Sequence, residues 1–302
     1  MNTQDVVMPS AGACFRAAIQ SHQPLPIVGT INAYSTLLAE QAGHAAIYCS
    51  GAGVANASYG WPDLGQTTLE QVLVDVKRLV SATSLPLLVD IDTGWGQQPG
   101  GVAHTIIAME AAGVAAVHLE DQVAAKRCGH RPDKQLVSTE TMVERIQTAV
   151  SAKTDPDFVI MARTDALAGE GMASAIERAI AYCEAGADMI FFEAAKSLSD
   201  YETFCASVSV PVLANSTEFG QTPLFSRKEL FAAGVAMVLY PLSAFRAMSQ
   251  AAETVYRTLL SEDNQSTLIN SMQTRDELYA HLNYWEQESQ QRQRTQQEKE
   301  DE

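Results

Sequence analysis

The feature that most constrains the fold is a series of short apolar runs, rich in β-branched residues, that recurs eight times along the chain. The runs are continuous rather than alternating, which is typical of strands buried on both faces of a sheet. They lie at 25–30, 45–50, 86–92, 115–120, 157–163, 188–193, 210–215 and 235–240. Helix-like segments separate most of them, for example 68–81, 102–112, 139–152 and 172–185. This order favours repeated strand–helix units and a parallel sheet.

Four of the junctions between a helix-like segment and the next run carry the same dipeptide. Glycine after a helix adopts the left-handed conformation that ends it, so each pair is expected to close a helix just before a strand. Eight such strands predict a closed (β/α)8 barrel. A doubly wound open sheet is the alternative, but no Gly-x-Gly-x-x-Gly follows the first run. The junctions are Ala42-Gly43, Ala112-Gly113, Ala185-Gly186 and Ala233-Gly234.

The overall charge narrows the choice of partners. The chain has 302 residues and a formal net charge of −16, which argues against nucleic acid or an anionic membrane as a partner.

No apolar stretch approaches the roughly 20 residues of a spanning helix, and the first residues lack the pattern of a signal peptide. The five cysteines are odd in number and none form a Cys-x-x-Cys spacing. That disfavours a disulfide framework or a structural zinc site, and it predicts that the protein is located in the reducing cytoplasm.

The domain organisation follows from the even composition of the chain. No linker-like change in composition divides it, so we expect one barrel domain with N- and C-terminal helical extensions over residues 1–285. Residues 286–302 are rich in Gln and Glu and contain almost no apolar side chains. This composition predicts a polar, disordered tail.

Polar and charged side chains close five of the predicted strands. In a (β/α)8 barrel the active site lies at the C-terminal ends of the strands, and such groups are costly to bury unpaired. We therefore expect one polar ring around a single site. A salt-bridge network that only closes the barrel mouth is the alternative. The closing segments are 90–92, 118–121, 163–165, Glu193 and 215–218.

The third strand ends in two aspartates, Asp90 and Asp92. Residues two apart on a strand project to the same face, and like charges so close repel each other unless a cation lies near them. Carboxylate oxygens without His or Cys favour Mg²⁺, with Mn²⁺ also possible. A cap or a turn is the ordinary alternative for Asp-x-Asp.

A single thiol lies among basic side chains in the run Lys126-Arg127-Cys128-Gly129-His130. Neighbouring positive charge lowers the pKa of a cysteine, and a tuned thiol on a loop suits proton transfer. A solvated surface loop is the alternative. Arg163, Arg246 and Arg275 are candidates for holding carboxylates, because a guanidinium binds a carboxylate in a bidentate manner. From the residues alone, a surface or packing role is the favoured alternative for Arg246 and Arg275.

The thiol run, with Asp90-Ile91-Asp92-Thr93-Gly94 upstream, resembles the isocitrate lyase and phosphoenolpyruvate mutase superfamily. The run resembles the carbon–carbon lyases of that superfamily in particular, and the likeness extends to about Trp285. It implies an Mg²⁺-dependent retro-Claisen cleavage of a tricarboxylate, 2-methylisocitrate, to pyruvate and succinate in the methylcitrate cycle of propionate breakdown. It also implies a homotetramer.

The resemblance implies catalytic and substrate-binding roles. Cys128 is expected to donate a proton to the succinate carbanion, with Lys126, His130 and Glu120 in the same catalytic group. The base that takes the hydroxyl proton stays open among Glu120, Asp63 and Tyr48. The expected substrate contacts are Ser50, Gly51, Ala52, Gly129, Arg163, Glu193, Asn215, Ser216, Thr217, Arg246 and Arg275.

The resemblance also implies a metal site. Asp90 and Asp92 match the metal-binding aspartates of the family, and Asp63 and Glu120 match acids that hold the metal through waters.

The chain departs from the family pattern in the substrate loop and in the sixth strand. Ala52 replaces the second glycine of the substrate loop, and Phe192 stands where many relatives have proline. Phe191, beside it, is expected to line the pocket for the substrate methyl group. These departures leave open a sibling lyase acting on isocitrate or 2,3-dimethylmalate, or an oxaloacetate decarboxylase. A non-catalytic barrel that serves as a binding or scaffold protein is the alternative from another class.

Overall fold

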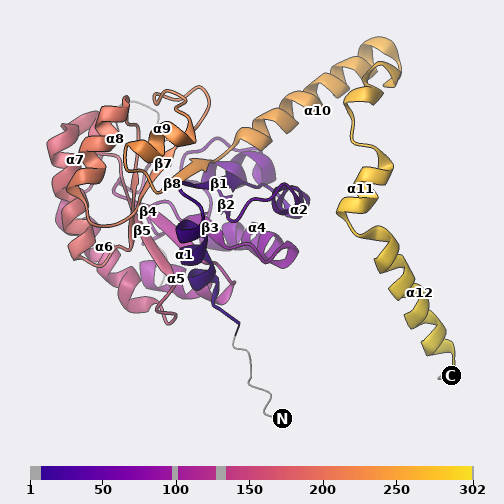
Figure 1. The fold of residues 1–302 in the computed structure, drawn as a ribbon, viewed down its shortest axis with the longest axis horizontal. Coiled ribbons are helices and arrows are strands. Elements are labelled where there is room, and N and C mark those ends of the chain that lie inside the picture. Colours follow the sequence, from indigo (N-terminus) through magenta and orange to yellow (C-terminus); the bar gives the residue numbers. More distant parts are fainter. Residues whose placement is uncertain (1–7, 97–100, 127–133, 301–302) are drawn as a thin grey trace. The chain divides into compact units, whose positions relative to one another are not determined.

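The computed structural model describes residues 8–96, 101–126 and 134–300, and its strands form a closed parallel barrel (Figure 1). Strand β1 pairs with β8 to close the ring, with Leu25 opposite Met237. The predicted (β/α)8 class is confirmed, and every predicted run overlaps one strand. The strands are β1 (Leu25–Gly29), β2 (Ile47–Cys49), β3 (Leu87–Asp90), β4 (Ala116–Glu120), β5 (Val159–Thr164), β6 (Met189–Phe192), β7 (Val212–Asn215) and β8 (Met237–Tyr240).

The helices of the barrel begin mostly at a Ser, Thr or Asn that accepts a hydrogen bond from the first turn, which satisfies backbone N–H groups that otherwise lack a partner. Helix α7 starts earlier than the predicted residue 172, because a short turn from Leu167 precedes Gly171, whose φ of 85° interrupts the helix. The helices are α1 (Ala11–Ser21), α2 (Ala33–Gln41), α3 (Gly51–Gly53), η1 (Val54–Ser58), α4 (Leu69–Ala82), α5 (Gly101–Ala111), α6 (Thr139–Ala152), α7 (Leu167–Glu184), α8 (Leu198–Ser207) and α9 (Arg227–Ala232).

The glycines at the four Ala-Gly junctions all have positive φ. Their values are 89° at Gly43, 84° at Gly113, 104° at Gly186 and 91° at Gly234. Each glycine ends a helix and turns the chain into the next strand, because only glycine takes this conformation without a steric cost. The repeated dipeptide therefore marks real helix ends.

Side chains of each strand alternate between the barrel interior and the layer that faces the helices. On β6, Phe191 belongs to the interior cluster, whereas Phe192 belongs to the outer one. Phe15 and Ala18 of α1 pack into the interior cluster, and Arg16 of the same helix binds the backbone oxygen of Asp157, just before β5. Helix α1 thus covers the N-terminal end of the barrel, and the C-terminal end remains for a site.

The chain forms two compact units, and the boundary lies between Phe245 and Arg246. No side chain described in the second unit is buried. No helix among the described residues is both long and apolar enough to cross a membrane. The elements from the boundary onward are α10 (Ser243–Glu262), η2 (Ser266–Ser271), α11 (Arg275–His281) and α12 (Tyr284–Glu300).

The end of the chain differs from the prediction of a disordered tail after residue 285. Helix α12 extends to Glu300, and its Gln, Glu and Arg residues are good helix formers. Arg292 pairs with Glu288 one turn earlier at 3.1 Å, which adds a little helix stability. The composition signalled correctly that this segment has almost no apolar face, but polarity alone does not prevent a helix. The single domain over 1–285 stays a prediction.

Candidate active site

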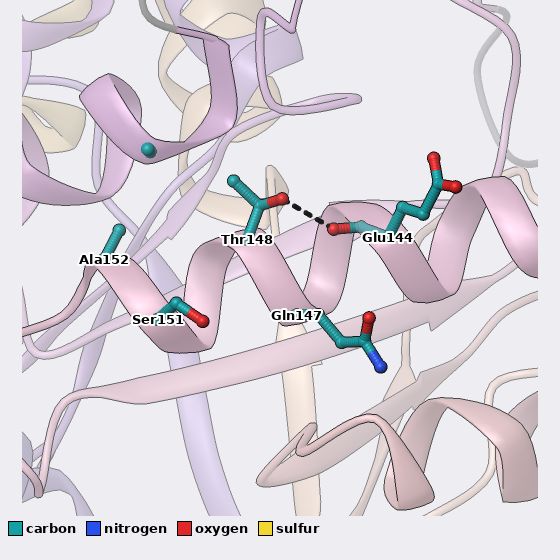
Figure 2. A pocket seen from close by; sticks show the side chains of 6 residues that line it. Glu144, Gln147, Thr148, Ser151 and Ala152 are labelled. Atoms are coloured by element: carbon teal, nitrogen blue, oxygen red, sulfur yellow. Dashed lines mark hydrogen bonds between the residues drawn. The ribbon is translucent and has the colours of Figure 1, made fainter.

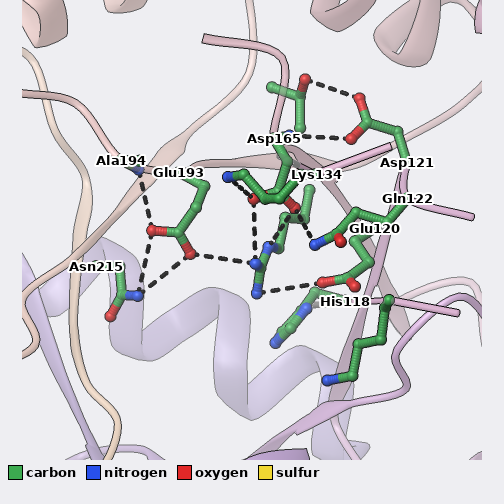
Figure 3. Close-up of polar contacts among 12 residues, drawn as sticks. His118, Glu120, Asp121, Gln122, Lys134, Asp165, Glu193, Ala194 and Asn215 are labelled. Carbon is green, nitrogen blue, oxygen red and sulfur yellow. Dashed lines mark hydrogen bonds and ion pairs between the residues drawn. The ribbon is translucent and has the colours of Figure 1, made fainter. Parts of the chain in front are cut away.

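The predicted strand-end residues meet at the C-terminal mouth of the barrel (Figure 3). They come from β2 to β7, and each is exposed by 8% or less. Charges at such depth need partners, because an unpaired charge is costly to bury. Gly51 is buried as well, and Ala52 is half-buried in α3. The buried set comprises Ser50, Asp90, Asp92, Glu120, Arg163, Glu193, Asn215, Ser216 and Thr217.

Lys126 supplies one of the cations of the mouth. Its Nζ lies 2.5 Å from Oδ1 of Asp92 and 2.9 Å from Oδ1 of Asp63. Burial alone would lower the pKa of Lys126, but the carboxylates, led by Asp92 and Asp90, raise it well above its usual value. Burial raises the pKa of Asp92 to about 6, with Lys126 opposing and Asp90 adding to the rise. Lys126 is therefore a permanent ammonium that links the carboxylate of Asp92, two residues past β3, to that of Asp63.

The floor of the mouth is built from two rings and a carboxylate. The hydroxyl of Tyr48 lies 2.9 Å from Nε2 of His118, and Nδ1 of His118 lies 3.8 Å from Oδ1 of Asp90. Burial lowers the pKa of His118 to about 4, so the imidazole is neutral at pH 7. Burial opposes ionisation of Asp90, but His118, Lys126 and Arg163 outweigh it and lower the pKa of Asp90 to about 2. Asp90 is therefore ionised.

Gly51 brings the backbone of the substrate loop against Asp90. Its N–H donates to Oδ2 of Asp90 at 3.2 Å, and a Cβ at this position would lie 3.0 Å from the same oxygen. Any larger residue would therefore push the carboxylate away. Ser50 stabilises the turn, because its hydroxyl accepts from the N–H of Gly53 at 3.2 Å.

Arg163 is the second cation, and three carboxylates surround its guanidinium. Its Nη1 lies 3.3 Å from Oε2 of Glu120, its Nη2 lies 3.4 Å from Oε2 of Glu193, and its Nε lies 3.1 Å from Oδ2 of Asp165. The guanidinium carbon lies 5.1 Å from the centre of the Phe191 ring. Burial opposes the charge, but these carboxylates raise the pKa of Arg163 well above its usual value.

Glu193 and Asn215 form the far side of the mouth. The amide nitrogen of Asn215 lies 3.4 Å from Oε1 and 3.3 Å from Oε2 of Glu193. The backbone N–H of Ala194, a residue with a φ of 62°, donates to Oε1 of Glu193 at 3.0 Å. A left-handed non-glycine residue stores strain, and such strain clusters at functional sites.

The backbone after β3 is left-handed at three positions, with φ of 49° at Asp92, 87° at Gly94 and 48° at Trp95. The indole N–H of Trp95 donates to the backbone oxygen of Thr67 at 2.8 Å. A cavity of about 220 Å³ reaches Asp92 beside this turn and includes Trp95 and Thr67 in its lining. Solvent and small ligands thus have space next to Asp92.

A second hollow, of about 550 Å³, lies on the outer surface of the barrel along α6 (Figure 2). Among the described residues that line it, Glu144 is the one titratable side chain. The hydroxyl of Thr148 donates to the backbone oxygen of Glu144 at 2.7 Å, within the helix itself. Because acid–base and metal chemistry need several such groups together, the barrel mouth is the candidate active site.

The chain contributes three mouth residues that the predicted site set lacked: Asp165, Gln122 and Lys134. Asp165 accepts from Nε2 of Gln122 at 3.1 Å and from Nζ of Lys134 at 2.6 Å. Asp165 follows Arg163 by two positions, so its place at a strand end was a usable signal. Lys134 and Gln122 carry no local signal, because only the folded chain brings them to Asp165.

The remaining predicted site residues lie either outside the described residues or in the second unit. Cys128, Gly129 and His130 lie outside the described residues. Arg246, in α10, and Arg275, the first residue of α11, belong to the second unit.

The donor set at the mouth fits a hard divalent cation. Oε1 of Glu120 is buried without a hydrogen-bond partner in the described part of the chain, and burial raises the pKa of Glu120 well above its usual value. No three His, Cys, Asp or Glu side chains among the described residues already form a closed metal site. Mg²⁺ needs no such cage, because it keeps several waters and uses one or two carboxylates. Asp90 and Asp92 can provide these.

The fold and the mouth together define a (β/α)8-barrel enzyme with its site at the C-terminal ends of the strands. The model of the family described as phosphoenolpyruvate phosphomutase matches residues 15–260. A 2-methylisocitrate lyase of Vibrio cholerae serotype O1 is 62% identical over 285 residues, which cover 92% of each chain.

Solved structures agree with these matches. A 2,3-dimethylmalate lyase is 32% identical with a TM-score of 0.86, over 95% of this chain and 96% of that one. A phosphonopyruvate hydrolase in complex with oxalate and Mg²⁺ is 29% identical with a TM-score of 0.81, over 93% of this chain and 98% of that one. The chain belongs to the phosphoenolpyruvate mutase and isocitrate lyase superfamily, and within it to the carbon–carbon lyases.

Proposed function

We propose that the chain cleaves 2-methylisocitrate to pyruvate and succinate in an Mg²⁺-dependent retro-Claisen reaction. The observation that carries the proposal is the mouth itself, where buried carboxylates surround Lys126 and Arg163. The name of the Vibrio cholerae relative supports the choice of substrate. The proposed pathway is propionate breakdown through the methylcitrate cycle.

We assign the metal site to Asp90 and Asp92, with Asp63 and Glu120 acting through water. When bound there, Mg²⁺ supplies Lewis-acid stabilisation of the substrate alkoxide. The solved relative in complex with oxalate and Mg²⁺ supports this assignment. The alternative ion is Mn²⁺, which prefers the same oxygen donors.

The chain's own residues perform the proton transfers. Burial raises the pKa of Glu120 well above its usual value, so its carboxylate is a stronger base than an exposed one. Burial also raises the pKa of Tyr48 well above its usual value, so Tyr48 holds its own proton at pH 7. Asp63 is bound to Lys126. The raised pKa of Glu120 favours it among the three candidates for the base. Cys128 is then proposed to protonate the succinate carbanion.

The substrate contacts follow from the mouth. Arg163 and the loop of Ser50, Gly51 and Ala52 are proposed to hold the substrate carboxylates, together with the amide and hydroxyl groups after β7. Arg246 and Arg275 stay proposed contacts from the second unit, and Gly129 a proposed contact beside Cys128. Lys126 and His130 stay proposed members of the catalytic group around Cys128.

The two aromatic residues of β6 have separate environments. Phe191 faces the interior with its ring near His118 at 5.0 Å. Phe192 faces the helix layer and stacks on Phe204 at 3.8 Å. The departure at Phe192 therefore lies away from the mouth and leaves the proposed methyl pocket to Phe191. One methyl group discriminates by roughly 10- to 200-fold, so some cleavage of isocitrate is expected.

The proposal is tested by incubating the purified protein with 2-methylisocitrate and Mg²⁺. Stoichiometric pyruvate and succinate are expected, with loss of activity in excess chelator and recovery on adding Mg²⁺. A parallel panel contains isocitrate, 2,3-dimethylmalate and oxaloacetate. A higher kcat/KM on one of these would contradict the substrate, and no cleavage of any would contradict an enzyme of this class.

We also propose a homotetramer, supported by apolar side chains exposed on the second unit. A surface with many exposed apolar side chains is typical of an interface with another chain. The side chains, each at least 36% exposed in the described structure, are Met248, Tyr256, Leu259, Leu260, Ile269, Leu282, Tyr284 and Trp285.

Light scattering of the purified protein tests the assembly. The expected mass is about four times the chain mass of 32.6 kDa. The double variant Tyr256→Glu/Leu260→Glu is expected to lower it, because both residues are strongly exposed, by 69% and 88%. Ile180→Glu, on α7 of the barrel, is the control and should keep the mass. A monomeric wild-type protein would contradict the proposal.

We place the enzyme in the cytoplasm, acting on a small molecule rather than on nucleic acid or a membrane. The four cysteines within the described residues, Cys14, Cys49, Cys183 and Cys205, are free thiols, which supports a reducing compartment.

A further inference from the structure

Asp165 lies just past β5 and is 2% exposed. Its two carboxylate oxygens accept from Nε and Nη2 of Arg163 at 3.1 and 3.2 Å (Figure 3). The same oxygens accept from Gln122 at 3.1 Å and from Lys134 at 2.6 Å. A carboxylate with four donors on it cannot rotate, so it is a fixed support.

The contact between Arg163 and Asp165 differs from the other contacts of Arg163. It is bidentate, and two parallel N–H···O bonds set the plane of a guanidinium as well as its place. The contacts to Glu120 and Glu193 are single ion pairs of 3.3 and 3.4 Å. Asp165 therefore determines the plane of the guanidinium, while its Nη1 edge is held only loosely.

Asp165 is itself held in place by a second buried carboxylate, that of Asp121. Its backbone N–H donates to Oδ1 of Asp121 at 2.9 Å, and Oδ2 of Asp121 accepts from the hydroxyls of Thr164 at 2.8 Å and Tyr182 at 3.0 Å. Asp121 is fully buried. The support of Arg163 thus extends through two buried carboxylates to α7.

We propose that Asp165 is a positioning residue: it sets the guanidinium of Arg163 over Phe191 so that the Nη1 edge meets a carboxylate of the substrate. Lys134 acts through Asp165, because its ammonium neutralises the carboxylate and fixes its orientation. Lys134 is the first described residue after the segment that contains Cys128. The inference rests on the proposed function, since it assigns Arg163 to a substrate carboxylate.

The barrel offers a matched control at its opposite end. Asp188, just before β6, accepts from Arg16 at 2.6 Å, from Lys153 at 3.4 Å and from the N–H of Ile160 at 2.9 Å. It has the same kinds of partner as Asp165, namely one Arg and one Lys. It faces the N-terminal end, away from the mouth.

The first experiment compares Asp165→Asn with Asp188→Asn in steady-state kinetics and thermal melting. Both variants are expected to lose stability. Only Asp165→Asn should change catalysis, with KM for 2-methylisocitrate raised by about 10-fold or more and kcat lowered less, because a charge-assisted contact is displaced. Asp165→Glu, which keeps the charge, should recover part of the loss. Lowered stability with unchanged KM in Asp165→Asn would overturn the inference.

The second experiment tests the route from Lys134. Lys134→Met should raise KM in the wild-type background and add little in the Asp165→Asn background, since its target carboxylate is gone. Lys153→Met is the control and should leave KM unchanged in both. Full additivity of Lys134→Met and Asp165→Asn would overturn the role of Lys134.

A third measurement does not depend on turnover. Succinate, a dicarboxylate, should raise the melting temperature of the wild type and of Asp188→Asn but not of Asp165→Asn. If the wild type cleaves no 2-methylisocitrate, the proposed function fails, while this comparison still decides the inference. Equal stabilisation of all three proteins by succinate would overturn it. If Asp165→Asn does not fold, Lys134→Met takes its place in the same comparison.

Discussion

Replacing Cys128 by serine is expected to lower kcat by about 10²-fold or more. A serine hydroxyl has nearly the same shape as the thiol but is a much weaker acid. Protonation of the succinate carbanion would therefore be slower. On either side of the segment that contains Cys128, Lys126 pairs with Asp63 and Asp92, and Lys134 pairs with Asp165. Steady-state kinetics at saturating substrate measures the effect.

The control for this prediction is Cys14→Ser. Cys14 is a half-buried thiol on α1, at the other end of the barrel. Both variants should melt near the wild-type temperature, and only Cys128→Ser should lose activity. Equal kcat in Cys128→Ser and wild type would exclude Cys128 as the proton donor and leave the lyase reaction to another acid.

Replacing Arg163 by methionine is expected to destabilise the protein by about 3–5 kcal/mol at pH 7. The change leaves Glu120, Asp165 and Glu193 without the cation that they share, and all three are buried. Removing one partner of a buried ion pair is costly because the remaining charge stays out of water. Urea denaturation followed by circular dichroism measures the loss.

The loss in Arg163→Met should shrink as the pH falls. Without the guanidinium, which opposes the effect of burial, the pKa of the Glu120 carboxyl in the folded state lies still further above its pKa in the unfolded chain. The folded state therefore binds protons first, and protonation relieves the destabilisation as the pH falls through the raised folded pKa. Arg78→Met is the control, because Arg78 is 64% exposed and pairs with Asp75 at 3.1 Å, so about 1 kcal/mol or less is expected. A comparable loss in both variants would contradict a buried role for Arg163.

Among the described residues of the mouth, carboxyl groups outnumber cations, which links these predictions to the metal. In the described residues, Asp63, Asp90, Asp92, Glu120, Asp165 and Glu193 face Lys126, Lys134 and Arg163. A tricarboxylate would add further negative charge. A divalent cation is the simplest means of balancing it, since Coulomb repulsion is strong where water is excluded. This charge balance supports the proposed Mg²⁺ dependence.

Much of the fold was readable from local patterns. The apolar runs predicted the strands, and the Ala-Gly pairs predicted helix ends that the positive φ values of Gly43, Gly113, Gly186 and Gly234 confirm. Strand ends are local features too, so Asp90, Glu120 and Arg163 could be assigned to one mouth. Residues 286–302 were the exception. A polar composition indicates that a segment is exposed to solvent, but it does not indicate whether the segment is helical.

The sequence by itself determined the barrel and most of the residues around its mouth, because burial on both faces of a strand and the ending of a helix leave local traces. Only the tertiary structure decided how those residues share charge. Asp165 meets Lys134 across 31 positions and Gln122 across 43, and Lys126 comes to lie between Asp63 and Asp92. Such pairs depend on which strand ends become neighbours when the barrel closes, and no local pattern records that.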